Sequence, residues 1–139
     1  MSLSASFSIL TPTLNPGPLL ACCVRSVADQ TTDRISVTHH IRDGGSTDGS
    51  LVGLPQWPGL DLVTAPDHGM YDALNRAGAA ATGDYVGLLN ADEQYQPGVL
   101  AQVVATFQQH PEWDILYAGF IVADAHWQPL CYRRPFLNT

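Results

Sequence analysis

The chain has 139 residues, of which 45% are hydrophobic, and it carries a net charge of −7 at pH 7. A chain of this length suits a single domain that buries about two thirds of the surface of its unfolded form. An acidic chain lacks the clustered lysine and arginine that nucleic acids and anionic membranes require, so we expect neither as a partner. The sequence contains no lysine, which excludes P-loop nucleotide hydrolases and Schiff-base enzymes because both depend on that residue.

Targeting signals and cysteine usage indicate the compartment. No apolar run approaches the roughly 18 residues of a membrane span, and the first residues lack the basic and apolar regions of a signal peptide. The three cysteines, Cys22, Cys23 and Cys131, are odd in number and form no CxxC motif. This usage is typical of reduced thiols, so we expect a cytoplasmic protein.

The first half of the chain alternates strands with helices. An apolar stretch predicts a strand at about residues 7–11, and Asn15 followed by Pro16 is typical of a helix start with Asn15 as the N-cap. Apolar residues then recur at helical spacing as far as Val27. A second strand is predicted over residues 35–42, and the glycines and prolines that follow leave room for only a short helix.

The second half continues the alternation. Its predicted elements are a strand at 60–64, a helix at 70–81 that Gly83 ends, a strand at 85–89, a helix from Pro97 to about Phe107, and a terminal hairpin with strands at 120–122 and 130–132. Alternating strands and helices predict right-handed crossovers and an α/β fold with a largely parallel sheet covered on both faces.

Four of the predicted strands end in polar clusters, at residues 11–15, 43–49, 66–69 and 90–93. The carboxyl ends of parallel strands meet at one edge of the sheet, and ligands bind at that edge in open α/β sheets. The sequence therefore predicts a binding site there.

Carboxylates dominate this predicted edge, and their crowding points to a ligand. Asp43, Asp67, Asp92 and Glu93 converge there, with Asp48 and Asp72 nearby. Two carboxylates about 5 Å apart repel by roughly 3 kcal/mol at an effective dielectric of 20, unless they are solvated, protonated, hydrogen-bonded to a ligand or bound to a cation. The adjacent Asp92 and Glu93 suit Mg²⁺ or Mn²⁺, which take oxygen ligands and share them with diphosphates. A carboxylate such as Asp43 can accept a hydrogen bond from a base or ribose, so a nucleoside diphosphate is the expected ligand.

Five short segments, in this order, closely resemble the family 2 glycosyltransferases of bacteria. They are TPTLN at 11–15, DGGSTDG at 43–49, DHGMYDALN at 67–75, ATGDY at 81–85 and LNADE at 89–93. The resemblance covers about residues 7–135. It implies the three-layer GT-A fold, in which a nucleotide-binding half with a mostly parallel sheet precedes an acceptor-binding half. It also implies inverting transfer of a sugar from a nucleoside-diphosphate donor, favoured here as a UDP-sugar, with Mg²⁺ or Mn²⁺. The expected acceptor is a carbohydrate or lipid-linked molecule of cell-surface polysaccharide synthesis.

The resemblance also implies roles for individual residues. Thr11, Thr13 and Asn15 are expected to line the base and ribose pocket, and Asp43 is expected to bind the base. The remaining expected roles are Asp67, Asp72, Asn75 and Arg76 near the ribose or diphosphate, Asp92 at the ribose or metal, and Glu93 as the metal ligand of a DXD-type motif.

Some of these residues also have simpler interpretations. Gly44 and Gly45 can be a plain tight turn, and Ser46 and Asp48 can cap the short helix. The segment from Asp72 to Arg76 can be an exposed helix face.

Two departures from the family pattern bear on activity. Glu93 stands where the family usually has aspartate, which moves the carboxylate further from the backbone. Inversion needs a general base, and the acids that follow Glu93, namely Glu112, Asp114 and Asp124, match no family base. We therefore expect residues 1–139 to be a single donor-binding domain truncated before the acceptor half.

Two alternatives remain beside that expectation. One is a non-catalytic nucleotide-sugar-binding module, and the other is a nucleotidyltransferase of related fold. A shortened domain exposes the face that its second half covers, so self-association is a further expectation.

Overall fold

The computed structural model describes residues 4–134. The chain forms two compact units, one ending at Val104 and the other beginning at Ala105.

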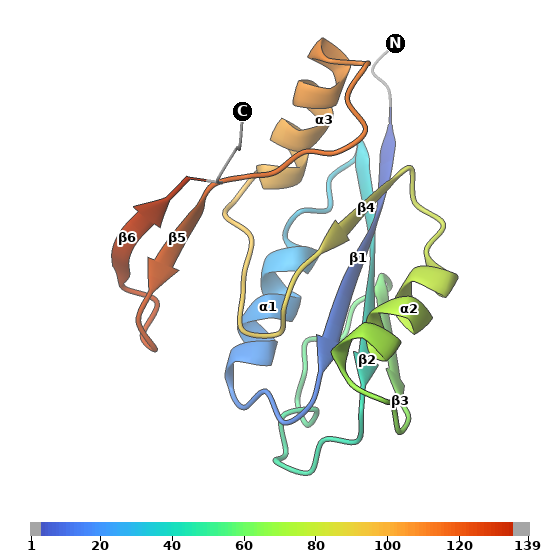
Figure 1. The fold of residues 1–139 in the computed structure, drawn as a ribbon, viewed down its shortest axis with the longest axis vertical. Helices are drawn as coiled ribbons and strands as arrows, with labels where there is room; N and C mark the ends of the chain where they lie inside the picture. The colour runs from blue at the N-terminus through green and yellow to red at the C-terminus, as the bar shows by residue number, and fades with distance from the viewer. Residues whose placement is uncertain (1–3, 135–139) are drawn as a thin grey trace. The chain divides into compact units, whose positions relative to one another are not determined.

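The first unit is built on a four-stranded parallel sheet with the order β3-β2-β1-β4. Its strands are β1 (Ala5–Thr13), β2 (Ile35–Asp43), β3 (Leu60–Thr64) and β4 (Tyr85–Leu88). Thr13 lies opposite Asp43, which in turn lies opposite Thr64. All four strands point the same way, downward in the view of Figure 1, so their carboxyl ends face one edge of the sheet. This confirms the predicted parallel α/β sheet.

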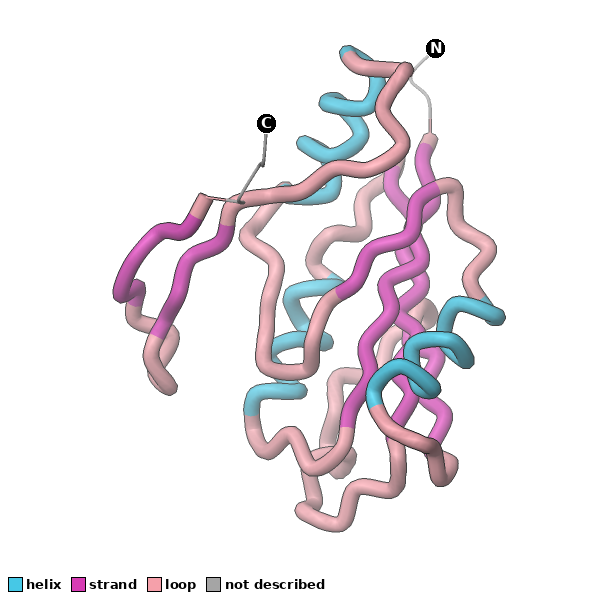
Figure 2. Tube along the Cα trace, viewed as in Figure 1, coloured by secondary structure: helices cyan, strands magenta, loops and turns pink. Residues whose placement is uncertain are grey.

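Helices cover both faces of this sheet (Figure 2). Alternation along β1 explains the two layers: Ile9 packs in one core cluster with Cys23 and Val27 of α1 (Leu19–Ala28). Its neighbour Leu10 points to the other face, toward α2 (Met70–Ala80). Burial raises the pKa of the Cys23 thiol to about 12, so this thiol is an inert core group.

A third helix, α3 (Val99–Gln109), begins within the first unit. Leu100 is buried in the cluster that contains Ile9, and Val103 and Val104 pack against it. The helix thus starts two residues after the predicted position at Pro97, a difference of boundary and not of type.

The predicted N-cap of the first helix is wrong. Helix α1 begins at Leu19, after Pro18, and has no side-chain cap. Asn15 instead adopts a left-handed φ of 49°, which asparagine tolerates better than most residues, and its Oδ1 accepts a hydrogen bond from the Thr47 N–H at 2.8 Å. A contact between two loops, which local sequence cannot reveal, therefore displaces the cap.

The short helix predicted after the second strand is also wrong, because the segment between β2 and β3 holds only turns. Ser46 and Asp48 bond to loop groups instead of capping a helix, as serine and aspartate often do when they compete with helical bonding. Gly83 does not end α2, which stops at an extended Ala81. A Cβ at Gly83 would lie 2.7 Å from the Ser8 nitrogen, so close backbone approach requires the glycine.

The second unit contains an antiparallel hairpin of β5 (Phe120–Ala123) and β6 (Pro129–Arg133). Asp124 closes its turn, since Oδ1 accepts hydrogen bonds from the N–H groups of His126 and Gln128. The predicted hairpin is thus confirmed. Across residues 4–134, every helix is too short or too polar to cross a membrane.

Candidate functional site

The loops that follow β1 and β2 are joined by hydrogen bonds at the carboxyl edge of the sheet. The Asn15 N–H donates to Ser46 Oγ at 2.7 Å, and the Thr47 N–H donates back to Asn15 Oδ1. The Gly17 N–H donates to Asp48 Oδ2 at 2.8 Å. Three cross-loop bonds therefore fix this part of the edge without any ligand.

Asp43, at the end of β2, is the centre of this arrangement. It is only 1% exposed. Its Oδ2 accepts the N–H groups of Gly45 and Ser46 at 3.0 and 2.9 Å, and its Oδ1 accepts the Ser46 hydroxyl. These bonds offset the cost of burying a charge. A carboxylate has about four acceptor positions, so three bonds leave room for one more donor, and the predicted contact with a base remains a prediction.

Thr11 and Thr13 differ in the surroundings of their hydroxyls. Thr11 is fully buried, and its hydroxyl donates to the Leu89 carbonyl at 2.7 Å while lying 2.7 Å from His39 Nε2. Burial, followed by the nearby His40, lowers the pKa of His39 to about 3, so the neutral ring donates Nε2–H to Thr11. Thr13 is 7% exposed, and its buried hydroxyl has no partner among the described residues. The Thr11 hydroxyl thus serves internal hydrogen bonds at the carboxyl edge, whereas the Thr13 hydroxyl can still bond to a ligand.

The loop after β3 brings Asp67 beside the Asp43 turn. Asp67 Oδ1 accepts the Gly69 N–H at 2.9 Å. A Cβ at Gly44 would lie 2.9 Å from Asp67 Oδ2, so the glycine lets the two loops approach. The structure therefore places Asp43 and Asp67 on neighbouring loops, as the sequence predicts.

Asp72 and Arg76 hold the start of α2 against the same loop. The His68 N–H bonds to Asp72 at 3.0 Å, and this bond, together with the nearby Arg76, holds the pKa of Asp72 below its usual value. Arg76 pairs with Asp72 at 2.9 Å and donates to the Pro66 carbonyl at 2.9 Å. Asn75 is exposed on the same helix. The Asp72–Arg76 pair therefore orders the loop that carries Asp67.

A pocket of about 270 Å³ lies between the ends of β2 and β3 and helix α2, and its surface is almost entirely apolar. Its lining residues are Arg42, Asp43, Val63, Ala65, Asp67, Ala73 and Arg76. Arg42 is absent from the predicted site residues. The signal that identifies it is an arginine inside a buried strand, since arginine is rarely buried without a partner.

Asp92 and Glu93 lie exposed in the turn after β4. Glu93 Oε2 accepts the Asn90 N–H at 2.9 Å, so one of its oxygens already serves the turn. Within residues 4–134, no three His, Cys, Asp or Glu side chains gather in a way that could hold a metal ion. Mg²⁺ and Mn²⁺ prefer oxygen ligands and often take only one or two carboxylates from the protein. Asp92 and Glu93 fit such a partial ligand set, completed by a diphosphate and water.

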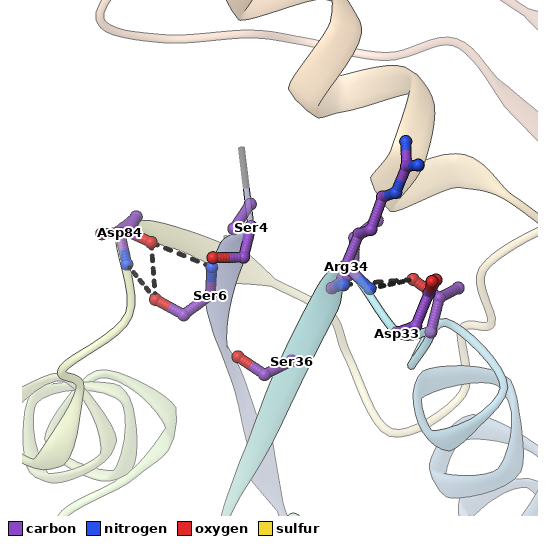
Figure 3. A pocket seen from close by; sticks show the side chains of 9 residues that line it. Ser4, Ser6, Asp33, Arg34, Ser36 and Asp84 are labelled. Carbon is purple, nitrogen blue, oxygen red and sulfur yellow. Dashed lines mark hydrogen bonds between the residues drawn. The ribbon is translucent and has the colours of Figure 1, made fainter. Parts of the chain in front are cut away.

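A second hollow, of about 240 Å³, lies at the opposite, amino edge of the sheet (Figure 3). There Asp84 Oδ2 accepts both the N–H and the hydroxyl of Ser6, and the Asp84 N–H donates to Ser6 Oγ. The two residues satisfy each other, and none of the predicted site residues lies there. The carboxyl edge is therefore the candidate site.

Comparison with known proteins identifies the family of the chain. The family model described as "Glycosyl transferase family 2" matches residues 8–134. PGL/p-HBAD biosynthesis glycosyltransferases from Mycobacterium bovis and Mycobacterium tuberculosis are 34% identical to the chain over 128 residues, which is 88% of this chain and 49% of theirs. The chain thus spans about half the length of these curated relatives.

Solved structures share the fold. Residues 1–349 of Staphylococcus aureus TarS in complex with UDP-GlcNAc match with a TM-score of 0.68 and 22% identity, over 76% of this chain and 32% of that one. A mannosyltransferase from Pyrobaculum calidifontis in complex with GDP-Man and Mn²⁺ matches with a TM-score of 0.65 and 24% identity, over 88% of this chain and 36% of that one. These likenesses identify the fold as GT-A. Given the family match over most of its length, the chain belongs to glycosyl transferase family 2.

Proposed function

We propose that this chain is the donor-binding part of a glycosyltransferase, and that it holds a nucleoside-diphosphate sugar at the carboxyl edge of the sheet. The observation that carries the proposal is the interlocked edge itself. Asp43 is buried and fixed by its own turn, while the loops after β1 and β2 are bonded to each other. Such preorganised polar groups bind a ligand at little ordering cost.

The apolar pocket beside α2 is the proposed place for the base. At about 270 Å³ it falls just below the usual range of roughly 300–1,000 Å³ for whole small-molecule sites, so it suits one ring system and not a complete nucleotide-sugar. Asp43, which lines it, offers the remaining acceptor position to a base N–H. Thr13, Asn15 and Asp67 are proposed to bond to the ribose.

The diphosphate is proposed to lie between α2 and the turn after β4. Asn75 and Arg76 supply polar groups on α2, and Asp92 and Glu93 would hold a divalent cation, Mg²⁺ or Mn²⁺. The Mn²⁺ in the Pyrobaculum mannosyltransferase complex supports this choice of group. When bound, such a cation neutralises charge that develops on the leaving diphosphate. The part of this chain is to orient the phosphates.

The proposed reaction is inverting transfer of the sugar to a hydroxyl of a carbohydrate or lipid-linked acceptor. A UDP-sugar is the favoured donor, supported by the UDP-GlcNAc in the TarS complex, and a GDP-sugar is the competing choice. Inversion requires a base that removes the acceptor proton.

A non-catalytic nucleotide-sugar-binding module is the second candidate. The observation that favours it is that several acids are already used locally. Glu93 bonds to Asn90, Glu112 lies 3.5 Å from His110, and Asp124 closes the hairpin turn. Among the described residues that follow β4, these three acids are therefore poor candidates for the general base that deprotonates the acceptor.

Release of nucleoside diphosphate from a sugar donor separates the two candidates. We expect Mn²⁺-dependent release of UDP from UDP-GlcNAc, or of GDP from GDP-mannose, if the chain is a transferase. Binding of a donor without release supports the module. Absence of both binding and release contradicts the two proposals together.

Self-association is a further part of the proposal. Edge strand β4 exposes Val86 and Leu88 at 57% and 66%, and an apolar strand at a sheet edge favours pairing with another chain. Sedimentation analysis over a range of concentrations is expected to show dimers. A monomer at every concentration contradicts this expectation.

A further inference from the structure

Three hydrogen-bonded side chains form a cluster that includes Arg42, a lining residue of the pocket beside α2. His40 and Arg42 lie two residues apart on the same face of β2, and Asp61 lies on the neighbouring strand β3. Asp61 Oδ2 accepts hydrogen bonds from both, at 2.7 Å from His40 Nδ1 and 2.8 Å from Arg42 Nη2. One carboxylate oxygen thus binds two cationic or donor groups at once.

The guanidinium of Arg42 has further hydrogen bonds beside the one to the Asp61 carboxylate. Its Nη1 also donates to the backbone carbonyls of Ile41 and Asp61, at 3.1 and 3.0 Å. The Arg42 side chain is only 11% exposed, whereas that of Asp61 is 37% exposed. Three hydrogen bonds therefore fix a nearly buried guanidinium, and among the described residues the only carboxylate that it bonds is Asp61.

The wall that Arg42 contributes to the pocket has a specific chemistry. Guanidinium N–H groups point outward in the plane of the group, so hydrogen bonds engage its rim and leave its two faces for stacking against an aromatic ring. The second arginine of the pocket, Arg76, is paired with Asp72. Both arginines are already paired with carboxylates and the pocket surface is apolar, so the pocket suits a neutral planar ring.

We propose that Arg42 is a wall of the nucleobase subsite and that Asp61, which does not line the pocket, is a positioning residue that holds the Arg42 guanidinium in place. This inference rests on the proposed function. His40 completes the arrangement, because its Nδ1 binds the same oxygen while its buried Nε2 has no partner among the described residues. A change at Asp61 then acts on the base through Arg42 and not on the diphosphate.

The test compares a ligand that has a base with one that lacks it. Binding of UDP, GDP and CDP, and of pyrophosphate, each with Mn²⁺, is measured by calorimetry on the wild-type chain and on Asp61→Asn. For the nucleotide that binds the wild type most tightly, we expect a loss of about 5- to 10-fold in affinity in Asp61→Asn. Affinity for pyrophosphate is expected to stay unchanged. A purely structural role for Asp61 would weaken both ligands alike or neither.

Two further variants keep the test decisive. Arg42→Lys retains the positive charge but loses the planar group, so it is expected to lose nucleotide affinity as Asp61→Asn does. Asp84→Asn is the matched control, because Asp84 is a hydrogen-bonded carboxylate at the opposite edge of the sheet (Figure 3), and it is expected to bind nucleotide as the wild type does.

The outcomes separate this inference from the proposed function. If the wild type binds a nucleotide and neither Asp61→Asn nor Arg42→Lys weakens that binding, the inference alone is overturned. No binding of any nucleotide by the wild type overturns both. If Asp61→Asn does not fold, Arg42→Lys decides by itself, since equal affinity in that variant and the wild type contradicts the proposed wall.

Discussion

The two edges of the central sheet carry hollows of similar size and a similar pair of residues, yet they differ in what the pair does. At the amino edge, exposed Asp84 bonds to Ser6, and the two residues join β1 to the chain before β4. At the carboxyl edge, Asp43 bonds to Ser46 but is 1% exposed and fixes a turn that is itself bonded to another loop. The same kind of residue pair therefore joins two chain segments at the amino edge and fixes a turn at the carboxyl edge.

Burial explains this difference. An exposed carboxylate exchanges water for protein partners at little net gain, whereas a buried one must keep its partners because an unsatisfied charge is costly. The nearby pocket has an apolar surface and anchored arginines. An aspartate and serine pair alone does not identify a site, so the proposed site rests on the burial of Asp43 and on the pocket beside it.

Among the variants that test this comparison, Asp43→Ala should have the largest effect on stability and on nucleotide affinity. It removes three hydrogen bonds from a buried turn, so we expect the free energy of unfolding to fall by about 3 kcal/mol. Nucleotide affinity should fall at least about tenfold, with and without Mn²⁺, because a 1.4 kcal/mol contact is worth that factor. Urea unfolding and calorimetry measure the two effects, and unchanged affinity would show that Asp43 is only structural.

Gly83→Ala tests the amino edge. Its new Cβ would meet the backbone at 2.7 Å from the Ser8 nitrogen and 2.8 Å from the Phe7 carbonyl carbon, so the strand must shift. We expect a loss of about 2 kcal/mol in stability with no change in nucleotide affinity once the protein is folded. A large loss of affinity in the folded variant would contradict the assignment of function to the opposite edge.

Glu93→Ala should change function while leaving stability within about 0.5 kcal/mol, since the side chain is exposed. We expect it to remove only the part of nucleotide binding that Mn²⁺ adds. Glu93→Asp is the matched control, because it keeps the carboxylate and is expected to retain some of that increment. Equal losses with and without Mn²⁺ would refute the proposed metal role.

The smallest effect concerns pH. Hydrogen bonds from the Ser6 side chain and backbone lower the pKa of Asp84, so the unfolded chain takes up this proton first as pH falls. The stability from this group is therefore present above the ordinary carboxyl pKa of about 3.9 and is lost as pH falls through the folded pKa. In Asp84→Asn, the melting temperature should fall less than in the wild type between about pH 5 and 3. An equal decrease in both proteins would contradict this assignment.

Much of the fold could be predicted because its signals are local. Apolar runs and helical spacing identify β1 to β4 and the three helices within residues 4–134, and Asp124 with Pro129 marks the hairpin turn. The edge at which we propose the site follows from parallel strands alone. These features depend on residues close in sequence, which is why patterns reveal them.

Three of the differences share one physical cause, namely contacts between distant segments. Asn15 has the residue type of a helix cap, but a bond to Thr47, 32 residues away, determines its conformation. Gly83 resembles a helix stop, but the backbone of β1 requires it. Arg42 lines the pocket because Asp61 on the next strand holds it. No local pattern encodes such partners.

The central claim is that the carboxyl edge binds a nucleoside diphosphate. It is tested most directly by a thermal-shift titration of this chain with UDP, GDP and CDP, each with and without Mn²⁺. A ligand that binds only the folded state raises stability by RT ln(1 + [L]/Kd), where [L] is the free ligand concentration. We predict that one nucleotide raises the melting temperature, that Mn²⁺ enlarges the shift, and that UDP gives the largest one. No shift with any nucleotide, at concentrations well above the millimolar range of weak sites, would contradict the claim.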